Sequence, residues 1–321
     1  MTAEQTDESP DPARAGRFEE REPGAPTSVV YRVDRVLERR QGRGHEVLLF
    51  ESAGLGKVLA LDGIVQLTEA DAYVYHEVLA HPALFAHPAP RRVAIVGGGD
   101  GHLAHEVLKH RAVERVWVLE ANPDVVEVAR AHFPPARDAY ADPRVELRHG
   151  DAFDLVLELE EPADLVLCDL TDPIGEAARL FEEPFYERCR RAMAEDGVLV
   201  AQTESLHFHP DTVRSCLGAV GRLFPHAALL WGAVATYPGA WWTFTVGSRR
   251  HDPRVARRRP RVETRLYHPR AHRWFFVPEP VLRRVLGPGP ALLEPLGREP
   301  ALGEVPGPGG GGGGGGQGPR G

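Results

Sequence analysis

The segment LVLCDLTDPIGEA, residues 165–177, places two carboxylates directly after an apolar run that predicts a buried strand. Asp169 ends that run, and Asp172 follows before Pro173 and Gly175. A carboxylate held at the end of a strand can remove a proton from a nucleophile or hold a cation. The same D-x-x-D-P pattern also fits an ordinary turn or a helix N-cap, so both interpretations stay open on these residues alone.

Further acids follow other predicted strands, beside a turn rich in glycine. VAIVGGGDGH contains Gly97, Gly99 and Asp100 between a predicted strand and a predicted helix, where bare backbone can approach a ligand closely. Glu120 closes the next strand about 20 residues on, where an acid typically accepts both ribose hydroxyls. Asp151 closes the third and can accept an adenine amino group, although ordinary turns use Asp there too. Together they predict an adenosine site, for a nicotinamide dinucleotide or an S-adenosylmethionine-type cofactor.

The position of Asp100 narrows the choice of ligand. Its carboxylate would repel the pyrophosphate of a dinucleotide and the carboxylate of S-adenosylmethionine. It would attract a ligand that ends in an ammonium, as decarboxylated S-adenosylmethionine does. Transfer of that molecule's aminopropyl group requires an amine to attack the carbon beside the sulfonium, and the amine must first lose a proton.

Asp169 is the natural general base for that proton, because its strand ends beside the predicted cofactor site. Tyr75 or Tyr237 is available to orient the amine, and Asp172 can hold a cationic nitrogen of the acceptor. The segment ATYPGAWWTF, residues 235–244, contains aromatic side chains that can line a narrow pocket for a polymethylene chain and contact its ammonium. The sequence thus predicts a site for a small amine.

Strand and helix patterns alternate from Arg92 onward, which predicts a parallel sheet covered by helices on both faces. In such sheets, ligands bind at the carboxyl ends of the strands. Short β-type runs before this region predict an antiparallel unit. We expect four segments, namely a disordered tail at 1–27, an N-terminal β domain with a connecting helix at 28–84, a Rossmann-like domain at 85–290 and a flexible glycine-rich tail at 291–321.

The composition of the chain argues against several kinds of binding partner. The 321 residues are 42% hydrophobic and carry a formal net charge of −8, which gives no basic surface for nucleic acid. The three cysteines form no CxxC pair and suit a reducing cytoplasm, and no apolar stretch is long enough to predict a membrane helix. The 15 histidines lack the spacing of a metal site. We therefore expect a cytoplasmic protein that binds a small molecule and no metal, nucleic acid or membrane.

Seven segments, in this order and spacing, resemble the polyamine aminopropyltransferases, of which spermidine synthase is the best-known member. They are LALDGIVQLTEADAYVYHE, VAIVGGGDG, VLEAN, HGDAF, CDLTDPIG, ATYPGAWWTF and HRWFFVP, within residues 30–290. The resemblance implies an α/β fold, with a methyltransferase-like Rossmann domain after a small N-terminal antiparallel β domain. It also implies a homodimer or homotetramer, and decarboxylated S-adenosylmethionine as a co-substrate that leaves as methylthioadenosine, with no cofactor besides.

The resemblance also implies roles for individual residues. Asp169 corresponds to the proton acceptor. The positions that line the amine acceptor are Tyr75, His76, Asp172, Gln202 and Tyr237. The positions on the donor side are His45, Gln66, Gly97, Gly99, Asp100, Glu120, Asp151, Ala152 and Glu176. Two of these depart from the family: His45 stands where a Gln is common, and Glu176 where a Pro is usual.

The expected activity is aminopropyl transfer to putrescine, which gives spermidine. The TYPG turn favours putrescine, whereas the extra acid at Glu176 keeps agmatine or a triamine open as acceptors. An S-adenosylmethionine-dependent methyltransferase is a second hypothesis, which Asp100 disfavours. A third is a paralogue without activity that binds adenosyl ligands, which the change at His45 keeps open and the retained Asp169 argues against.

Overall fold

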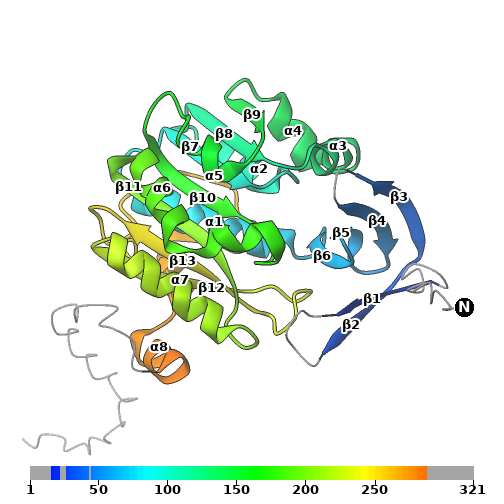
Figure 1. Ribbon diagram of the computed structural model, residues 1–321. Helices are drawn as coiled ribbons and strands as arrows, with labels where there is room; N and C mark the ends of the chain where they lie inside the picture. Colours follow the sequence, from blue (N-terminus) through cyan, green and yellow to red (C-terminus); the bar gives the residue numbers. More distant parts are fainter. Residues whose placement is uncertain (1–15, 22–26, 43–44, 288–321) are drawn as a thin grey trace, which may run out of the picture.

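The computed structural model describes residues 16–21, 27–42 and 45–287. A seven-stranded sheet forms its centre, in the strand order β12-β13-β11-β10-β7-β8-β9 (Figure 1). The strands are β7 (Arg92–Gly97), β8 (Arg115–Glu120), β9 (Val145–His149), β10 (Ala163–Asp169), β11 (Met193–Ser205), β12 (His226–Ala233) and β13 (Trp241–Ser248). Pairs among β7 to β11 are parallel, and β13 runs antiparallel to both its neighbours. The predicted α/β class with a mostly parallel sheet is confirmed.

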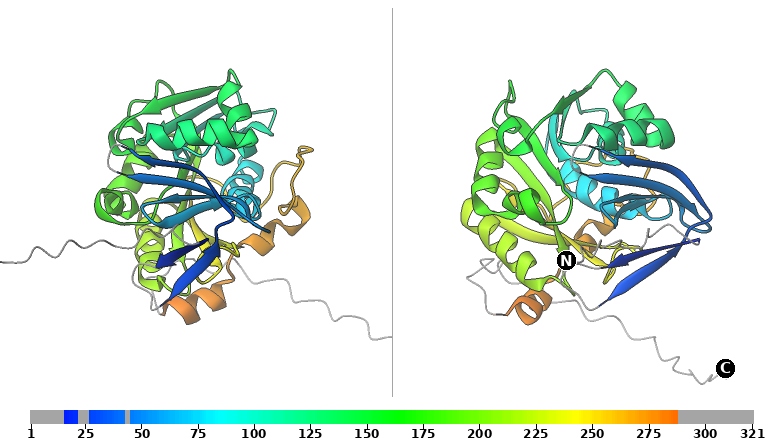
Figure 2. Two further views of the ribbon diagram at one scale, coloured as in Figure 1. Left: turned by 90° about the vertical axis from the view of Figure 1, so that its right-hand side faces the viewer. Right: turned by 45° about the vertical axis from the view of Figure 1, so that its right-hand side comes forward.

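Helices cover both faces of this sheet (Figure 2). Successive side chains of a strand point to opposite faces, so Val93 and Ile95 of β7 pack with one group of helices, and Ala94 and Val96 with the other. The helices are α1 (Ala72–Ala86), α2 (His102–Leu108), α3 (Pro123–His132), α4 (Pro134–Ala141), α5 (Ala152–Leu155), η1 (Gly175–Phe181), α6 (Glu183–Ala192), α7 (Pro210–Leu223), η2 (Pro269–Phe275) and α8 (Glu279–Leu286). Within the described ranges, none is both long and apolar enough to span a bilayer.

A four-stranded antiparallel sheet lies beside the central one (Figure 1). Its strands are β3 (Arg35–Gln41), β4 (Glu46–Ser52), β5 (Gly56–Leu61) and β6 (Ile64–Thr68). Val47 and Leu49 on one face pack against Val125 and Phe133, which belong to α3 and the turn after it. This contact holds the N-terminal strands against the helix that follows β8.

Strand β1 (Arg17–Arg21), paired with β2 (Ser28–Arg32), lies inside the segment that composition predicts to be a disordered tail, so that prediction is wrong for residues 17–21. Phe18 is fully buried, and its ring lies 5.3 Å from that of Phe50 in β4. The buried Glu20 carboxylate accepts hydrogen bonds from the Tyr31 hydroxyl at 2.9 Å and the Val65 amide at 2.9 Å. These partners lie far along the chain, so a local polar composition gave no sign of them. The rest of both predicted tails, apart from the turn residue Gly16 and Thr27, lies outside the described residues.

Helix α1 packs on the central sheet, although the predicted division places it with the N-terminal β unit. Glu77 of α1 is completely buried, and its carboxylate accepts backbone hydrogen bonds from Arg265, Leu266 and Tyr267 at 2.6–2.8 Å. These bonds attach the segment before η2 to the helix. Because α1 is fixed from both sides, Tyr75 and His76 in its second turn have defined positions.

Candidate active site

Three neighbouring strands end on the residues expected to do chemistry. Strand β7 ends at Gly97, β8 at Glu120 and β10 at Asp169, and the order β10-β7-β8 brings these ends together. Asp169 and Gly97 are paired residues in the ladder between β10 and β7. The strand order therefore brings these three residues to one edge of the sheet, at the carboxyl ends of the parallel strands.

Glycine is required where the turn after β7 meets these acids. Gly97 has φ +75°, and a Cβ there would lie 2.1 Å from the carbonyl oxygen of Asp169. A Cβ on Gly99 would lie 2.8 Å from a carboxylate oxygen of Glu120. Any side chain at either position would force the acids away from the turn. The glycines thus bring backbone N–H groups and carboxylates to one place.

His76 lies between two carboxylates. Its Nε2 is 3.7 Å from Asp100 Oδ1 and 3.7 Å from Asp169 Oδ2. Its Nδ1 lies 2.7 Å from the carbonyl oxygen of Ala72, which can only accept, so Nδ1 carries a proton and Nε2 faces the acids. In the part of the chain that the structure describes, the buried Asp169 Oδ2 has no hydrogen-bond partner. A buried acceptor without a donor is costly, and a ligand with N–H groups would satisfy it.

The charges in this cluster favour a cation. Burial alone would lower the pKa of His76, but the carboxylates of Asp100 and Asp169 raise it well above its ordinary value. Burial would raise the pKa of Asp100, but His76 and His102 hold it well below its ordinary value. His102 donates to Asp100 Oδ1 from its backbone N at 2.8 Å. His102 has no predicted role, although its spacing from Asp100 fits a local side-chain bond of this kind.

The fold also gathers metal-ligating atoms that the sequence spacing did not reveal. One atom each from His76, Asp100 and Asp169 lies within 4.8 Å of the others, a spacing that fits a metal ion. A second group contains Glu77, His81 and Glu106. There the Glu77 oxygens accept three backbone bonds and His81 Nε2 lies 3.1 Å from Glu106, so these atoms are already engaged. Of these two groups, only the first contains a buried oxygen without a described hydrogen-bond partner, Asp169 Oδ2.

Aromatic side chains stand beside Asp169. The rings of Tyr75 and Tyr237 are 5.8 Å apart, and Tyr237 contacts Trp242 at 4.7 Å. The Tyr237 hydroxyl donates to the carbonyl of Gln66, which connects β6 to the loop before β13. Burial, and then the Asp169 carboxylate, raise the pKa of both tyrosines well above the ordinary value. Both hydroxyls therefore stay protonated, and that of Tyr237 already donates to Gln66.

Gln202 holds the loop that contains Asp172. The side chain is buried, its Nε2 donates to the carbonyl of Leu170 at 3.1 Å, and its Oε1 accepts from the Glu204 amide at 3.0 Å. Asp172 lies near Tyr237, whose pKa it helps to raise. The described contacts of Gln202 thus position the acceptor-side loop.

Glu120 and Asp151 bind backbone at adjacent strand ends. Glu120 accepts from the amides of Gly99 at 3.0 Å and Asn122 at 2.7 Å, while burial raises its pKa to about 7. Asp151 caps α5 by accepting from the Phe153 amide at 2.9 Å. Ala152 follows as the buried first residue of α5. Asp151 also pairs with Arg179 of η1, a partner that sequence reasoning missed because two distant surface charges form no pattern.

Two predicted donor-side residues lie in more exposed places. His45 pairs with Asp62 across the N-terminal sheet, and its side chain is half exposed. The hairpin that carries it approaches α3, since Gly42 lies next to the Asp124 side chain. Glu176 is exposed in the first turn of η1. Neither residue has a described contact with the carboxylates at the strand ends.

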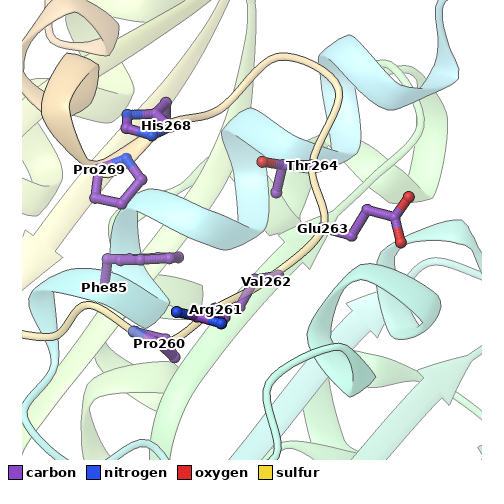
Figure 3. A pocket seen from close by; sticks show the side chains of 8 residues that line it. All are labelled: Phe85, Pro260, Arg261, Val262, Glu263, Thr264, His268 and Pro269. Carbon is purple, nitrogen blue, oxygen red and sulfur yellow. The ribbon is translucent and has the colours of Figure 1, made fainter.

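A cavity of about 490 Å³ lies elsewhere, between the end of α1 and the segment before η2 (Figure 3). Its walls include Phe85, Arg261, Glu263 and His268. None of the residues with predicted roles lines it. The cluster around His76, and not this cavity, therefore defines the candidate active site.

Comparisons with known proteins show the family of the chain. A spermine/spermidine synthase domain matches residues 72–258, and a spermidine synthase tetramerisation domain matches residues 16–69. A polyamine aminopropyltransferase from Hydrogenobaculum sp. (strain Y04AAS1) is 38% identical over 84% of this chain and 96% of its own length. One from Aquifex aeolicus (strain VF5) is 37% identical over the same shares.

Solved structures give the same result. A spermidine synthase in complex with the transition state analogue AdoDATO matches with a TM-score of 0.79 and 32% identity, covering 85% of this chain and 96% of the other. The spermidine synthase from Thermotoga maritima matches with a TM-score of 0.76 and 30% identity, covering 85% and 95%. The chain therefore belongs to the spermine/spermidine synthase family of polyamine aminopropyltransferases.

Proposed function

We propose that this enzyme transfers the aminopropyl group of decarboxylated S-adenosylmethionine to putrescine, forming spermidine, methylthioadenosine and a proton. The observation that carries the proposal is the buried Asp169 Oδ2, which has no hydrogen-bond donor among the described residues and lies beside His76 and Asp100. The acceptor nitrogen uses its lone pair to form a bond to the carbon next to the sulfonium. The C–S bond breaks at the same time, and the electron pair of that bond stays on sulfur, which leaves as a neutral thioether. Asp169 takes the proton that the nitrogen loses.

On the donor side, Asp100 holds the ammonium of the aminopropyl chain. Its low pKa supports this role, because it stays ionised at every physiological pH. Glu120 accepts the ribose hydroxyls, and Asp151 with Ala152 receives the adenine. The glycines at 97 and 99 let the backbone approach the ligand. Three further positions complete the proposed donor side: Gln66, His45 and Glu176.

On the acceptor side, Tyr75 and Tyr237 form an aromatic wall beside Asp169. The Tyr75 hydroxyl can donate to or accept from the amine. The Tyr237 hydroxyl already donates to the Gln66 carbonyl, so it can only accept from the amine. The faces of both rings suit a methylene chain and its ammonium. Asp172 holds the far nitrogen, and His76 contacts the chain near the reacting end. The two matched spermidine synthases support putrescine, while agmatine or a triamine is the alternative that Glu176 keeps open.

The test is an acceptor panel. The protein is incubated with decarboxylated S-adenosylmethionine and, separately, putrescine, cadaverine, agmatine and spermidine, and methylthioadenosine is measured. We expect putrescine to give the highest kcat/KM. Faster release with agmatine or spermidine would contradict the choice of acceptor, and no release with any amine would contradict the proposed function. S-adenosylmethionine is the control donor, and it should be a poor substrate because its carboxylate meets Asp100.

Donor binding should depend on pH through Glu120. The pKa of this acid is about 7, so it ionises as the pH rises from 6 to 8. The ionised form accepts stronger hydrogen bonds from ribose hydroxyls, so methylthioadenosine should bind about three- to tenfold more tightly at the higher pH. Calorimetric titration measures this, with Glu120→Gln as the control that should show no such dependence. Equal affinity of the unaltered protein across this range would contradict the role given to Glu120.

The proposal needs no cofactor, since the sulfonium of the co-substrate is already an activated leaving group. The match of residues 16–69 to a tetramerisation domain supports an oligomer, and we propose a homodimer or homotetramer. We also place the enzyme in the cytoplasm, where Cys168, Cys189 and Cys216 would stay reduced; all three are free and buried.

A further inference from the structure

An ion pair closes the loop after β10 onto the loop after β9. Arg179 of η1 donates from its guanidinium to Asp151 Oδ2. The same guanidinium lies 5.0 Å from the centre of the Phe153 ring. The other oxygen of Asp151 accepts from the Phe153 amide at 2.9 Å and so caps α5. Both oxygens of Asp151 therefore have a donor in the protein itself.

The pair lies beside the strand end that carries Glu120, the residue to which the proposed function assigns the ribose. Asp151 follows β9, the strand next to β8, and Glu120 ends β8. The amide of Gly150 donates to the Glu120 carbonyl at 3.3 Å, so the two strand ends are in contact. The proposed function places the ribose on Glu120 and the base at Asp151. An adenine amino group that donates to Asp151 then meets oxygens that already accept from Arg179 and from the Phe153 amide.

We propose that Arg179 is a latch on the adenine subsite, and that its bond to Asp151 must open before the donor can bind. This inference rests on the proposed function, because that function places adenine at Asp151. Only molecules in which the pair is open can bind an adenosyl ligand. The apparent affinity is therefore the intrinsic affinity multiplied by the fraction of molecules in which the pair is open.

The expected effect is modest, since the two side chains are 42% and 41% exposed. Ion pairs of this exposure stabilise a closed state enough to change an affinity by about two- to fivefold. Salt also weakens such ion pairs, so the affinity gained by removing Arg179 should depend on the salt concentration. An arginine with a merely structural role would give no such salt dependence. Both effects can be followed with methylthioadenosine, which contains the adenosine part and needs no acceptor.

The chain offers a matched control in Arg222 of α7. Arg222 pairs with Glu183 of α6 at 2.7 Å, with side chains 59% and 40% exposed. This pair also joins two elements at the surface, but it involves no residue of the proposed site. Arg179→Gln and Arg222→Gln therefore remove the same charge from similar pairs, and only the first opens the latch.

The experiment measures the Kd of methylthioadenosine by calorimetry for the unaltered protein and both variants, at about 0.05 M and about 0.5 M NaCl. We expect Arg179→Gln to bind about two- to fivefold more tightly at low salt, with the difference shrinking at high salt. Arg222→Gln should match the unaltered protein at both. Equal or weaker binding by Arg179→Gln would overturn the latch. If none of the three proteins bound methylthioadenosine, the proposed function would fail, and the latch with it.

Discussion

Replacing Asp169 with Asn is expected to lower kcat by about 10²- to 10⁴-fold, the range that a general base contributes. Asn keeps the shape of the side chain but cannot take a proton from the amine. The buried Oδ2 of Asp169 has no donor of its own within the described chain, so no hydrogen bond to that oxygen is lost with the change. Steady-state rates with saturating donor and putrescine measure the loss.

The affinity for methylthioadenosine is the control for this variant. The nucleoside is proposed to lie on Glu120 and Asp151, and it needs no proton acceptor, so its Kd should change less than about threefold. Equal losses of kcat and of nucleoside affinity would place Asp169 in the donor subsite and would remove its role as the base. An unchanged melting temperature would show that the variant is folded.

The strand ends could be predicted because their signal is local. An apolar run followed by Gly97, Glu120 or Asp169 identifies a buried strand and its last residue, and parallel strands bring such ends to one edge. Nothing beyond the pattern of each strand was needed. The expected edge of acids and glycines follows from this rule, and the observed order β10-β7-β8 agrees with it.

The contacts across the site could not be predicted in this way. His76 lies on α1, and only the packing of that helix on the sheet brings its imidazole within 3.7 Å of Asp100 and Asp169. Sequence also does not tell whether a polar side chain faces a ligand or a loop. Gln202 was expected at the acceptor, and its amide is bonded to the carbonyl of Leu170.

The N-terminal strand β1 also could not be predicted from the local sequence. The residues around Phe18 are polar and charged, which is typical of a disordered tail. Their order depends on Tyr31, Phe50 and the Val65 amide, none of which is near in the sequence. Local composition measures only what a segment can bury by itself, so it misses a strand that is stabilised by distant partners.

Replacing Asp100 with Asn should weaken donor binding, whereas the change at Asp169 should lower kcat. The Asn amide oxygen can still accept the 2.8 Å hydrogen bond from the His102 backbone N, but the charge that faces the donor ammonium is gone. Loss of one partner of a buried charge pair costs about 2–3 kcal/mol, so the KM for decarboxylated S-adenosylmethionine should rise roughly 30- to 150-fold.

Methylthioadenosine distinguishes this electrostatic effect from damage to the site, because it has the adenosine of the donor and lacks the aminopropyl ammonium. Its Kd should be nearly the same for Asp100→Asn and the unaltered protein. The pKa of His76 should fall in the variant, since one of the two carboxylates that raise it has been removed. If donor and methylthioadenosine lost affinity equally, Asp100 would be a structural support of the glycine turn and not the residue that selects a decarboxylated donor.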